Sequence, residues 1–130
     1  MIRPQYHFRS GSQGLKAWNV ARLIRASRAL PIIEVPLDDL SELDEPYWGR
    51  TPMTVREVAT HAGLMLAADT GFPILLCAEG RIMDGMHRVA RAHLDGQSAI
   101  AARRFPVTPH PDYENAVPDQ LSYDPKDFQI

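Results

Sequence analysis

The sequence predicts one α+β domain followed by an extended, proline-rich end. Between residues 19 and 105, short apolar runs bounded by turn residues alternate with segments of helical periodicity. Hydrophobic residues make up 45% of the 130 residues and charged residues 23%, which is the balance of a folded soluble chain with one core. After Phe105, five prolines divide the chain into pieces too short for long helices. We therefore divide it into an N-terminal arm (1–18), a compact domain (19–105) and a proline-rich acidic tail (106–130).

The first segments predict an arm and then an amphipathic helix. Residues 1–17 mix Gly11, Ser12 and Gly14 with scattered aromatic side chains, which is typical of a loop lying over a core. Asn19 has the residue type of a helix N-cap, and Pro31 ends the helix. The apolar face of this helix carries Val20, Leu23, Ile24 and Ser27.

An apolar strand and an acidic turn come next. Residues 32–37 read as a strand at a sheet edge or end, because Pro36 has no amide hydrogen to donate to a neighbouring strand. A short helical turn follows at residues 38–43. Asp38 and Asp39 would hold magnesium through their oxygens, or they are ordinary caps of that turn.

An aromatic loop precedes the clearest helix of the chain. The loop at residues 45–50 carries Tyr47 and Trp48, which either plug a gap in a small core or stack on a ligand as part of a lid. Thr54 and Glu57 then have the spacing of a capping box. The helix that they open places six residues on one face: Val55, Val58, Ala59, Ala62, Met65 and Leu66.

The following residues predict a strand pair, a helix and a last strand. Strands at 72–77 and 80–83 flank a turn, and the helix after them runs to about Leu94 and ends at Gly96. The last strand covers residues 98–105. The apolar face of the helix carries Met86, Val89, Ala90, His93 and Leu94. The only cysteine, Cys77, excludes an internal disulfide and a cysteine-based zinc site, and its apolar surroundings predict a buried thiol.

The junction between the second of these strands and the helix carries the chemistry. Gly85 allows a tight turn, and the residues after it present free amides at the positive end of a helix dipole. His87 and Arg88 add side-chain donors, and the planar guanidinium of arginine suits a phosphate. Asp84 precedes the turn as a cap, a base or a metal contact. On the alternative interpretation, Asp84 is only a cap, Arg88 a solvated side chain and His87 a satisfied polar partner.

Residues 84–92 spell Asp-Gly-Met-His-Arg-Val-Ala-Arg-Ala. They resemble the signature of the ParB/sulfiredoxin superfamily, whose members carry Asp-Gly-x-His-Arg or Gly-x-x-Arg-x-x-Ala at a strand-to-helix turn. The resemblance extends from about Ile32 to Phe105 and implies a small mixed sheet flanked by helices. Met86 stands where sulfiredoxins have their cysteine, which argues against sulfinic acid reductase activity. His87 stands where the partition proteins have an arginine, so CTP specificity does not follow.

The resemblance also implies a function, because members of the superfamily bind nucleotides at this turn and some phosphorylate free serine. It implies a nucleoside di- or triphosphate with Mg²⁺, held at Gly85, Met86, His87 and Arg88. Asp84 would lie at the reacting end. Glu34 would be a second catalytic carboxylate, the general base, if its strand neighbours the strand before the turn. Otherwise Glu34 is one of several surface carboxylates. The sequence shows no dense cluster of carboxylates and histidines that would predict a metal site built from protein ligands.

The leading hypothesis is therefore a nucleotide-binding domain that is a phosphotransferase or a nucleotide hydrolase. The alternative is a noncatalytic interaction module that uses the aromatic loop and the tail. Aromatic residues of the tail would anchor it to the body or to a partner protomer, forming a homodimer. A partition-like protein with nonspecific DNA binding is the third hypothesis. The absence of a helix-turn-helix segment after the domain argues against sequence-specific DNA binding.

Charge and hydropathy bound the partners further. The net charge is only −2, but the first thirty residues hold six basic side chains and no acidic one. Residues 34–45 and the tail are acidic, so the blocks pair within the fold or leave a basic face for phosphate or nucleic acid. No apolar run approaches the roughly 20 residues of a membrane-spanning helix, and the N-terminus lacks the apolar core of a signal peptide. These features predict a cytoplasmic protein without membrane contact.

Overall fold

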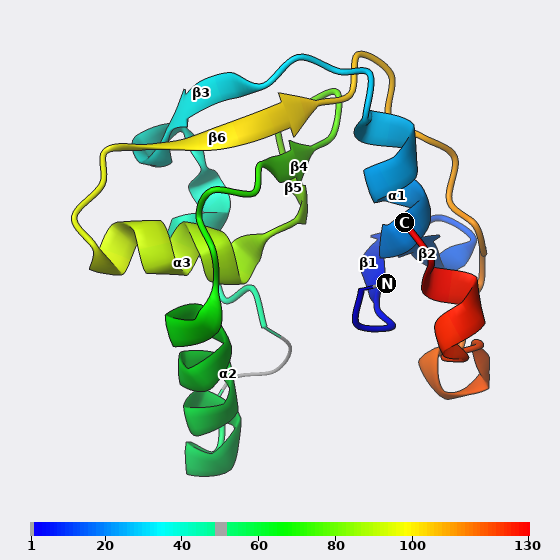
Figure 1. The fold of residues 1–130 in the computed structure, drawn as a ribbon. Coiled ribbons are helices and arrows are strands. Elements are labelled where there is room, and N and C mark those ends of the chain that lie inside the picture. The colour runs from blue at the N-terminus through cyan, green and yellow to red at the C-terminus, as the bar shows by residue number, and fades with distance from the viewer. Residues whose placement is uncertain (1, 49–51) are drawn as a thin grey trace.

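The computed structural model describes residues 2–48 and 52–130, and within them the chain has the α+β fold that the sequence predicts (Figure 1). A two-stranded hairpin and a four-stranded sheet are combined with three α-helices. The helices and strands, in chain order, are β1 (Tyr6–Gly11), β2 (Gly14–Asn19), α1 (Val20–Ser27), β3 (Ile33–Pro36), α2 (Val55–Ala67), β4 (Ile74–Leu76), β5 (Ile82–Asp84), α3 (Met86–Leu94) and β6 (Ala99–Arg104). Short 3₁₀ turns complete the chain at Leu37–Asp39, Ser41–Asp44, Pro118–Gln120 and Pro125–Phe128.

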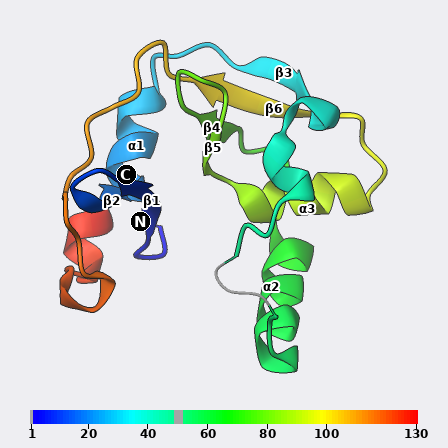
Figure 2. The same cartoon turned by 180° about the vertical axis from the view of Figure 1, so that it is seen from behind.

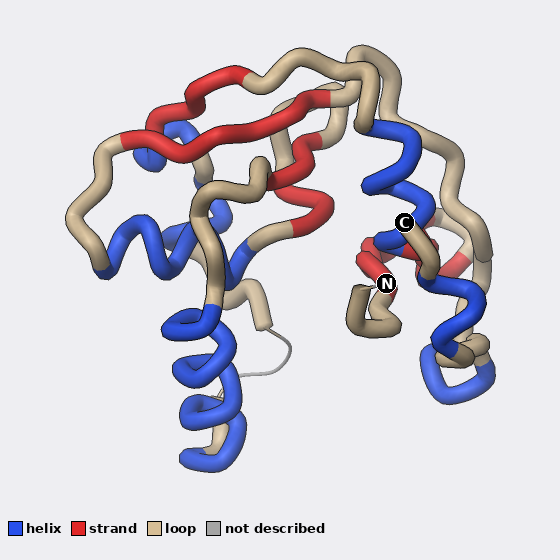
Figure 3. Tube along the Cα trace, in the orientation of Figure 1, coloured by secondary structure: helices blue, strands red, loops and turns tan. Residues whose placement is uncertain are grey.

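The larger sheet is mixed, and its strand order is β3-β6-β4-β5 (Figure 3). The edge strand β3 runs antiparallel to β6, and β5 runs antiparallel to β4, whereas β4 and β6 are parallel. The pairing of β4 with β6 requires a crossover, and α3 supplies it between β5 and β6. This arrangement places the start of α3 directly after the edge strand β5.

Alternating side chains of the central strands build a core on each face of the sheet. In β4, Ile74 and Leu76 enter one core, while Leu75 and the following Cys77 enter the other. Successive side chains of a strand point to opposite faces, so three residues are enough to join both cores. The first core is covered by α3 and the turn after β3, through Leu37, Leu40, Met86, Val89 and Ala92. The second is covered by the hairpin and α1, through Trp18 and Leu23.

The N-terminal segment forms a hairpin, where the sequence predicted an arm or loop. β1 and β2 are joined by a two-residue turn between Gly11 and Gly14, and Gly14 has a φ of +95° that suits glycine. The tail adds a bridge from Tyr113 to Ala17 of β2. Two short strands gain stability when further chain packs on them, and here that chain comes from the other end of the sequence. Asn19 caps α1 as predicted, accepting from the Arg22 amide at 3.3 Å.

The proline-rich tail folds back on the body. Phe128 is completely buried, and its ring lies 5.4 Å from that of Tyr6, centre to centre. Asp112 forms an ion pair with Arg22 and accepts from the Asn19 amide at 2.7 Å. Phe128, one of the tail aromatics considered as anchors, therefore packs on the body of the same chain.

Helix α2 projects away from the sheet (Figures 1 and 2). Its N-terminus has the predicted capping box of Thr54 and Glu57. None of the described residues of α2 is buried, and the apolar face that the sequence indicates is open, with Val55 87% and Leu66 66% exposed. Among the described elements, its main packing partner is α3. Because packing stabilises α2 so little, its stability depends on its caps and on any partner that covers the open face.

Helix α3 buries a slightly different face from the predicted one. Met86, Val89 and Ala92 are buried against the sheet, whereas His93 and Leu94 are exposed. The buried face is rotated slightly from the predicted one and is narrower, because positions i, i+3 and i+6 form a narrower stripe than the five predicted residues. Gly96 ends the helix with a φ of +72°, as its residue type predicts.

Candidate functional site

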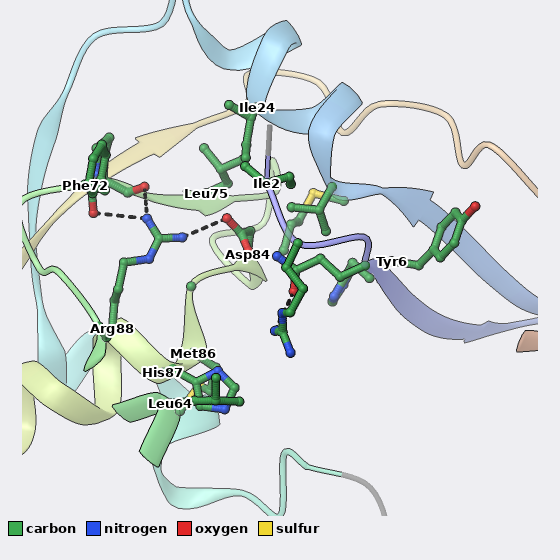
Figure 4. Close-up of a pocket in the computed structure, with 18 of the residues that line it drawn as sticks. Ile2, Tyr6, Ile24, Leu64, Phe72, Leu75, Asp84, Met86, His87 and Arg88 are labelled. Atoms are coloured by element: carbon green, nitrogen blue, oxygen red, sulfur yellow. Dashed lines mark hydrogen bonds and ion pairs between the residues drawn. The ribbon is translucent and has the colours of Figure 1, made fainter. Parts of the chain in front are cut away.

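A cleft with a volume of about 990 Å³ lies beside the start of α3 (Figure 4). One wall comes from the N-terminal arm, β1 and α1, including Ile2, Tyr6 and Ile24. The opposite wall comes from the end of β5, the start of α3 and the inner side of α2. The size falls within the range of about 300–1,000 Å³ that is typical of small-molecule sites.

The turn between β5 and α3 opens into this cleft. Gly85 has φ +114° and ψ +21° and occupies the N-cap of α3 without a side-chain cap. A Cβ on Gly85 would lie only 2.6 Å from Cγ2 of Ile74, so both conformation and space require glycine here. The carbonyl of Gly85 accepts from the Val89 amide at 3.0 Å, which begins the helix. The amides of its first turn have no acceptor within the helix, so they are available to an anion.

Arg88 holds this turn in place. Its guanidinium forms a 2.7 Å ion pair with Asp84, one helical turn earlier, and also donates to the carbonyls of Phe72 (3.1 Å) and Pro73 (2.7 Å). The side chains of Arg88 and Asp84 are largely buried, with 17% and 14% of their surface exposed. The structure therefore brings Asp84, Gly85, Met86, His87 and Arg88 together at one junction. Most hydrogen-bond donors of the Arg88 guanidinium are used within the protein, so few are left for a ligand.

His87 belongs to a cluster of three aromatic rings. Its Nε2 lies 2.8 Å from Nδ1 of His61 on α2, and the two ring centres are 5.1 Å apart with planes 21° from parallel. This geometry describes two rings joined edge to edge. Trp48 lies parallel to both, with its ring centre 4.5 Å from that of His61 and 4.8 Å from that of His87. The indole therefore covers one face of the histidine pair.

Electrostatics keep His87 neutral. Burial, then the neighbouring His61 and the charge of Arg3, lower the pKa of His87 to about 4. Tyr47, which packs edge-on to Trp48, has its pKa raised to about 12, mainly by burial. Tyr47 and Trp48 pack against the core, which is the first of the two roles predicted for the aromatic loop, and they also line the cleft. The remaining loop residues, 49 and 50, lie outside the described part of the chain.

Glu34 does not reach this site. It lies exposed on β3, where it pairs with Ala101 of β6, and β6 and β4 separate it from β5 and Asp84. The condition for a catalytic role of Glu34, that its strand neighbours the strand before the turn, is therefore not met. Asp38 and Asp39 follow β3 at the same edge and are also exposed. Glu34 and Asp39 line a separate, smaller cavity of about 260 Å³.

Arg3 and His61 are the site residues that the sequence analysis missed. Both line the cleft, but His61 is 26 positions from His87 and Arg3 is 84. His61 sits on the helix with the capping box, yet no local pattern in the sequence relates it to the turn. Their approach depends on the packing of α2 on α3 and of the hairpin on the sheet.

Comparisons with family models, with curated proteins and with solved structures gave no match to this chain. Within residues 2–48 and 52–130, no group of three or more histidine, cysteine or acidic side chains is placed to hold a metal ion. The helices described over the same ranges include none with the length and apolar character needed to cross a membrane.

Proposed function

We propose that the protein binds a nucleoside di- or triphosphate in the cleft, with the phosphates at the Gly85 turn. The observation that carries this proposal is the start of α3, where uncapped amides open into a cleft of nucleotide size. Backbone amides and the helix dipole together favour a negatively charged group at this point.

The charges of the cleft support an anionic ligand. Arginines outnumber acidic residues among its described lining residues, which include Arg3, Arg28, Arg88, Arg103, Asp69 and Asp84. Asp84 is neutralised by Arg88. The field of the remaining groups is positive, and a cleft with low-dielectric walls concentrates such a field. The neutral His87 adds a donor or an acceptor beside the turn without adding charge.

We propose that Mg²⁺ binds together with the nucleotide at this turn. The carboxylate of Asp84 lies directly before the turn, and one carboxylate with phosphate oxygens and water is a common way to hold this ion. His87 and Asp84 are the proton acceptors of the turn, since Glu34 lies at the other edge of the sheet. A phosphotransferase or hydrolase activity would therefore depend on these two residues rather than on Glu34.

The proposal is tested by nuclear magnetic resonance on the 14.6 kDa protein. Titration with ADP and Mg²⁺ is expected to shift the amide signals of Gly85, Met86 and His87, and to leave Asp119 in the tail unchanged. Adenosine, which lacks phosphates, is the matched ligand control and should shift the three amides far less. ATP, CTP and GTP then rank the bases. Unchanged signals at the turn with every nucleotide would contradict the proposal.

The open face of α2 favours a second candidate function, that of an interaction module. Val55, Val58 and Leu66 lie exposed on one helix, an arrangement more typical of a contact surface than of a solvated helix. Sedimentation equilibrium of the wild-type protein and of Leu66→Glu tests self-association through this face. A mass that falls to that of the monomer only in the variant would support it, and a monomeric wild type would remove self-association as the explanation.

A further inference from the structure

The arginines that line the cleft differ in what already holds them. Arg88 is bound to Asp84 and to two carbonyls, as described above. Arg103 donates to the carbonyls of Arg28 and Leu30. These guanidiniums fix the walls of the cleft. A ligand phosphate would have to break existing bonds to use them, which reduces any gain.

Arg3 is held much more loosely. The side-chain hydrogen bond described for it runs to Oε1 of Gln5 at 3.0 Å, two residues along the chain, and this bond is exposed. An exposed bond of this kind contributes little and is exchanged easily for a stronger, charge-assisted one. Arg3 therefore offers the cleft a cation whose donors are not committed to the fold.

The position of Arg3 relative to the turn follows from two observations. Arg3 lines the same cleft as Gly85 and His87, from the opposite wall. The charge of Arg3 also contributes to the lowered pKa of His87. The arm is kept in place on either side of Arg3, by the bond from the Ile2 amide to the Phe128 carbonyl at 3.4 Å and by β1, which begins at Tyr6. In Figure 4, Ile2 from the arm and Asp84 from β5 are seen as parts of one cavity.

We propose that Arg3 binds the phosphate of the ligand from the arm, so that the phosphate is held between the amides of α3 and a guanidinium across the cleft. This inference rests on the proposed function and names a specific contact within it. It replaces Arg88, the arginine that the sequence indicated for the phosphate, with Arg3, because Arg88 shapes the turn and Arg3 meets the ligand. It also gives the N-terminal segment a function, since this segment places a cation at a turn that lies 82 positions later in the sequence, at Gly85.

Calorimetric titration of the wild-type protein, Arg3→Ala and Arg3→Lys with ADP and Mg²⁺, and with inorganic pyrophosphate, tests this contact. Arg3→Ala is expected to weaken both ligands roughly 10- to 100-fold, the usual range for one hydrogen bond to a charged group. Arg3→Lys should lie between, since lysine keeps the charge without the planar fork. Arg56→Ala is the matched control, because Arg56 is an exposed arginine on α2 that does not line the cleft, and its affinity should equal that of the wild type.

The outcomes separate the two proposals. Wild-type binding with an Arg3→Ala affinity within twofold of it would overturn the role of Arg3 and leave the phosphate turn standing. Failure of the wild-type protein to bind either ADP or pyrophosphate would overturn both. Arg3 is exposed, so its substitution should leave the fold intact, and matching far-ultraviolet circular dichroism and urea midpoints of all variants verify this.

Discussion

The Nδ1 of His61 and the Nε2 of His87 lie 2.8 Å apart, joining the projecting helix α2 to the start of α3. One nitrogen of this contact donates and the other accepts, so a neutral pair satisfies it and a doubly protonated pair does not. Trp48 closes one face of the pair. The contact therefore couples the geometry of the turn to the protonation of His87.

The first prediction concerns the dependence of stability on pH. The pKa of His87 is about 4 in the folded protein and 6.5 for an ordinary histidine, so between these values the unfolded chain binds a proton that the folded chain does not. The stability from this group is complete above about pH 6.5 and falls as the pH drops towards 4. We expect His87→Gln to reduce the loss of urea midpoint between pH 7.5 and pH 5.

The matched control for this measurement is His93→Gln, an exposed histidine on the same helix, which should leave the pH dependence as in the wild type. His7 is partly buried and also has a pKa of about 4. Part of the pH dependence should therefore persist in His87→Gln and diminish further in the double variant His7→Gln/His87→Gln. Equal pH profiles for the wild type and His87→Gln would show that the pKa of His87 is not lowered in the folded protein.

The second prediction concerns Arg88 as a structural residue. Arg88→Ala removes the ion pair with Asp84 and the donors to the carbonyls of Phe72 and Pro73. We expect the free energy of unfolding to fall by about 1–3 kcal/mol, because these partners are left partly buried and unsatisfied. Arg56→Ala, on an exposed site, should change it by less than about 0.5 kcal/mol. Urea denaturation measures both, and an unchanged midpoint for Arg88→Ala would contradict the assignment.

The third prediction compares two glycines. Gly85→Ala places a Cβ at 2.6 Å from Ile74 in a left-handed conformation, so we expect a loss of about 1–3 kcal/mol or more. Gly63→Ala, in the exposed middle of α2, meets nothing within 4 Å and should stabilise by about 0.5–1 kcal/mol. Thermal unfolding of the two variants should move in opposite directions. A shift of the same sign in both would refute this reading of the turn.

The fourth prediction concerns the buried carboxylate of Glu42, which is 2% exposed. Its Oε2 accepts from the Ile82 amide at 2.6 Å and lies 3.7 Å from Nε of Arg81, which ties the turn after β3 to the start of β5. Glu42→Ala should cost about 2–4 kcal/mol, since it leaves a buried amide without this acceptor and opens a cavity. Glu42→Gln keeps one acceptor oxygen and should cost less. Asp44→Ala, exposed on the same turn, serves as the control measured by urea denaturation.

The features that the sequence predicted correctly are those decided by a few neighbouring residues. The Asn19 cap, the capping box of Thr54 and Glu57, and the left-handed glycine at Gly96 each follow from side-chain or backbone chemistry within one turn. The junction at Gly85 belongs to the same class, because a short apolar strand, a glycine and a helical pattern succeed one another directly.

The features that were missed depend on contacts between distant segments. The hairpin was not predicted because its strands are supported by Tyr113 and Phe128 of the tail. The sequence left the placement of Glu34 open because strand order is a property of the whole sheet, and β6 takes the position beside β3. The histidine pair combines two helices, and neither helix alone indicates the other's histidine.

The positions of the chain ends have a practical consequence for handling the protein. Ile2 and Ile130 both line the cleft, and Figures 1 and 2 mark the two termini near one another. A purification tag fused to either end would emerge beside this cleft, and a polyhistidine tag would bring extra titratable groups beside Arg3 and His87. Protein without such fusions is therefore the appropriate material for every titration. Comparing ligand affinity before and after cleavage of a tag would show whether the tag blocks the cleft.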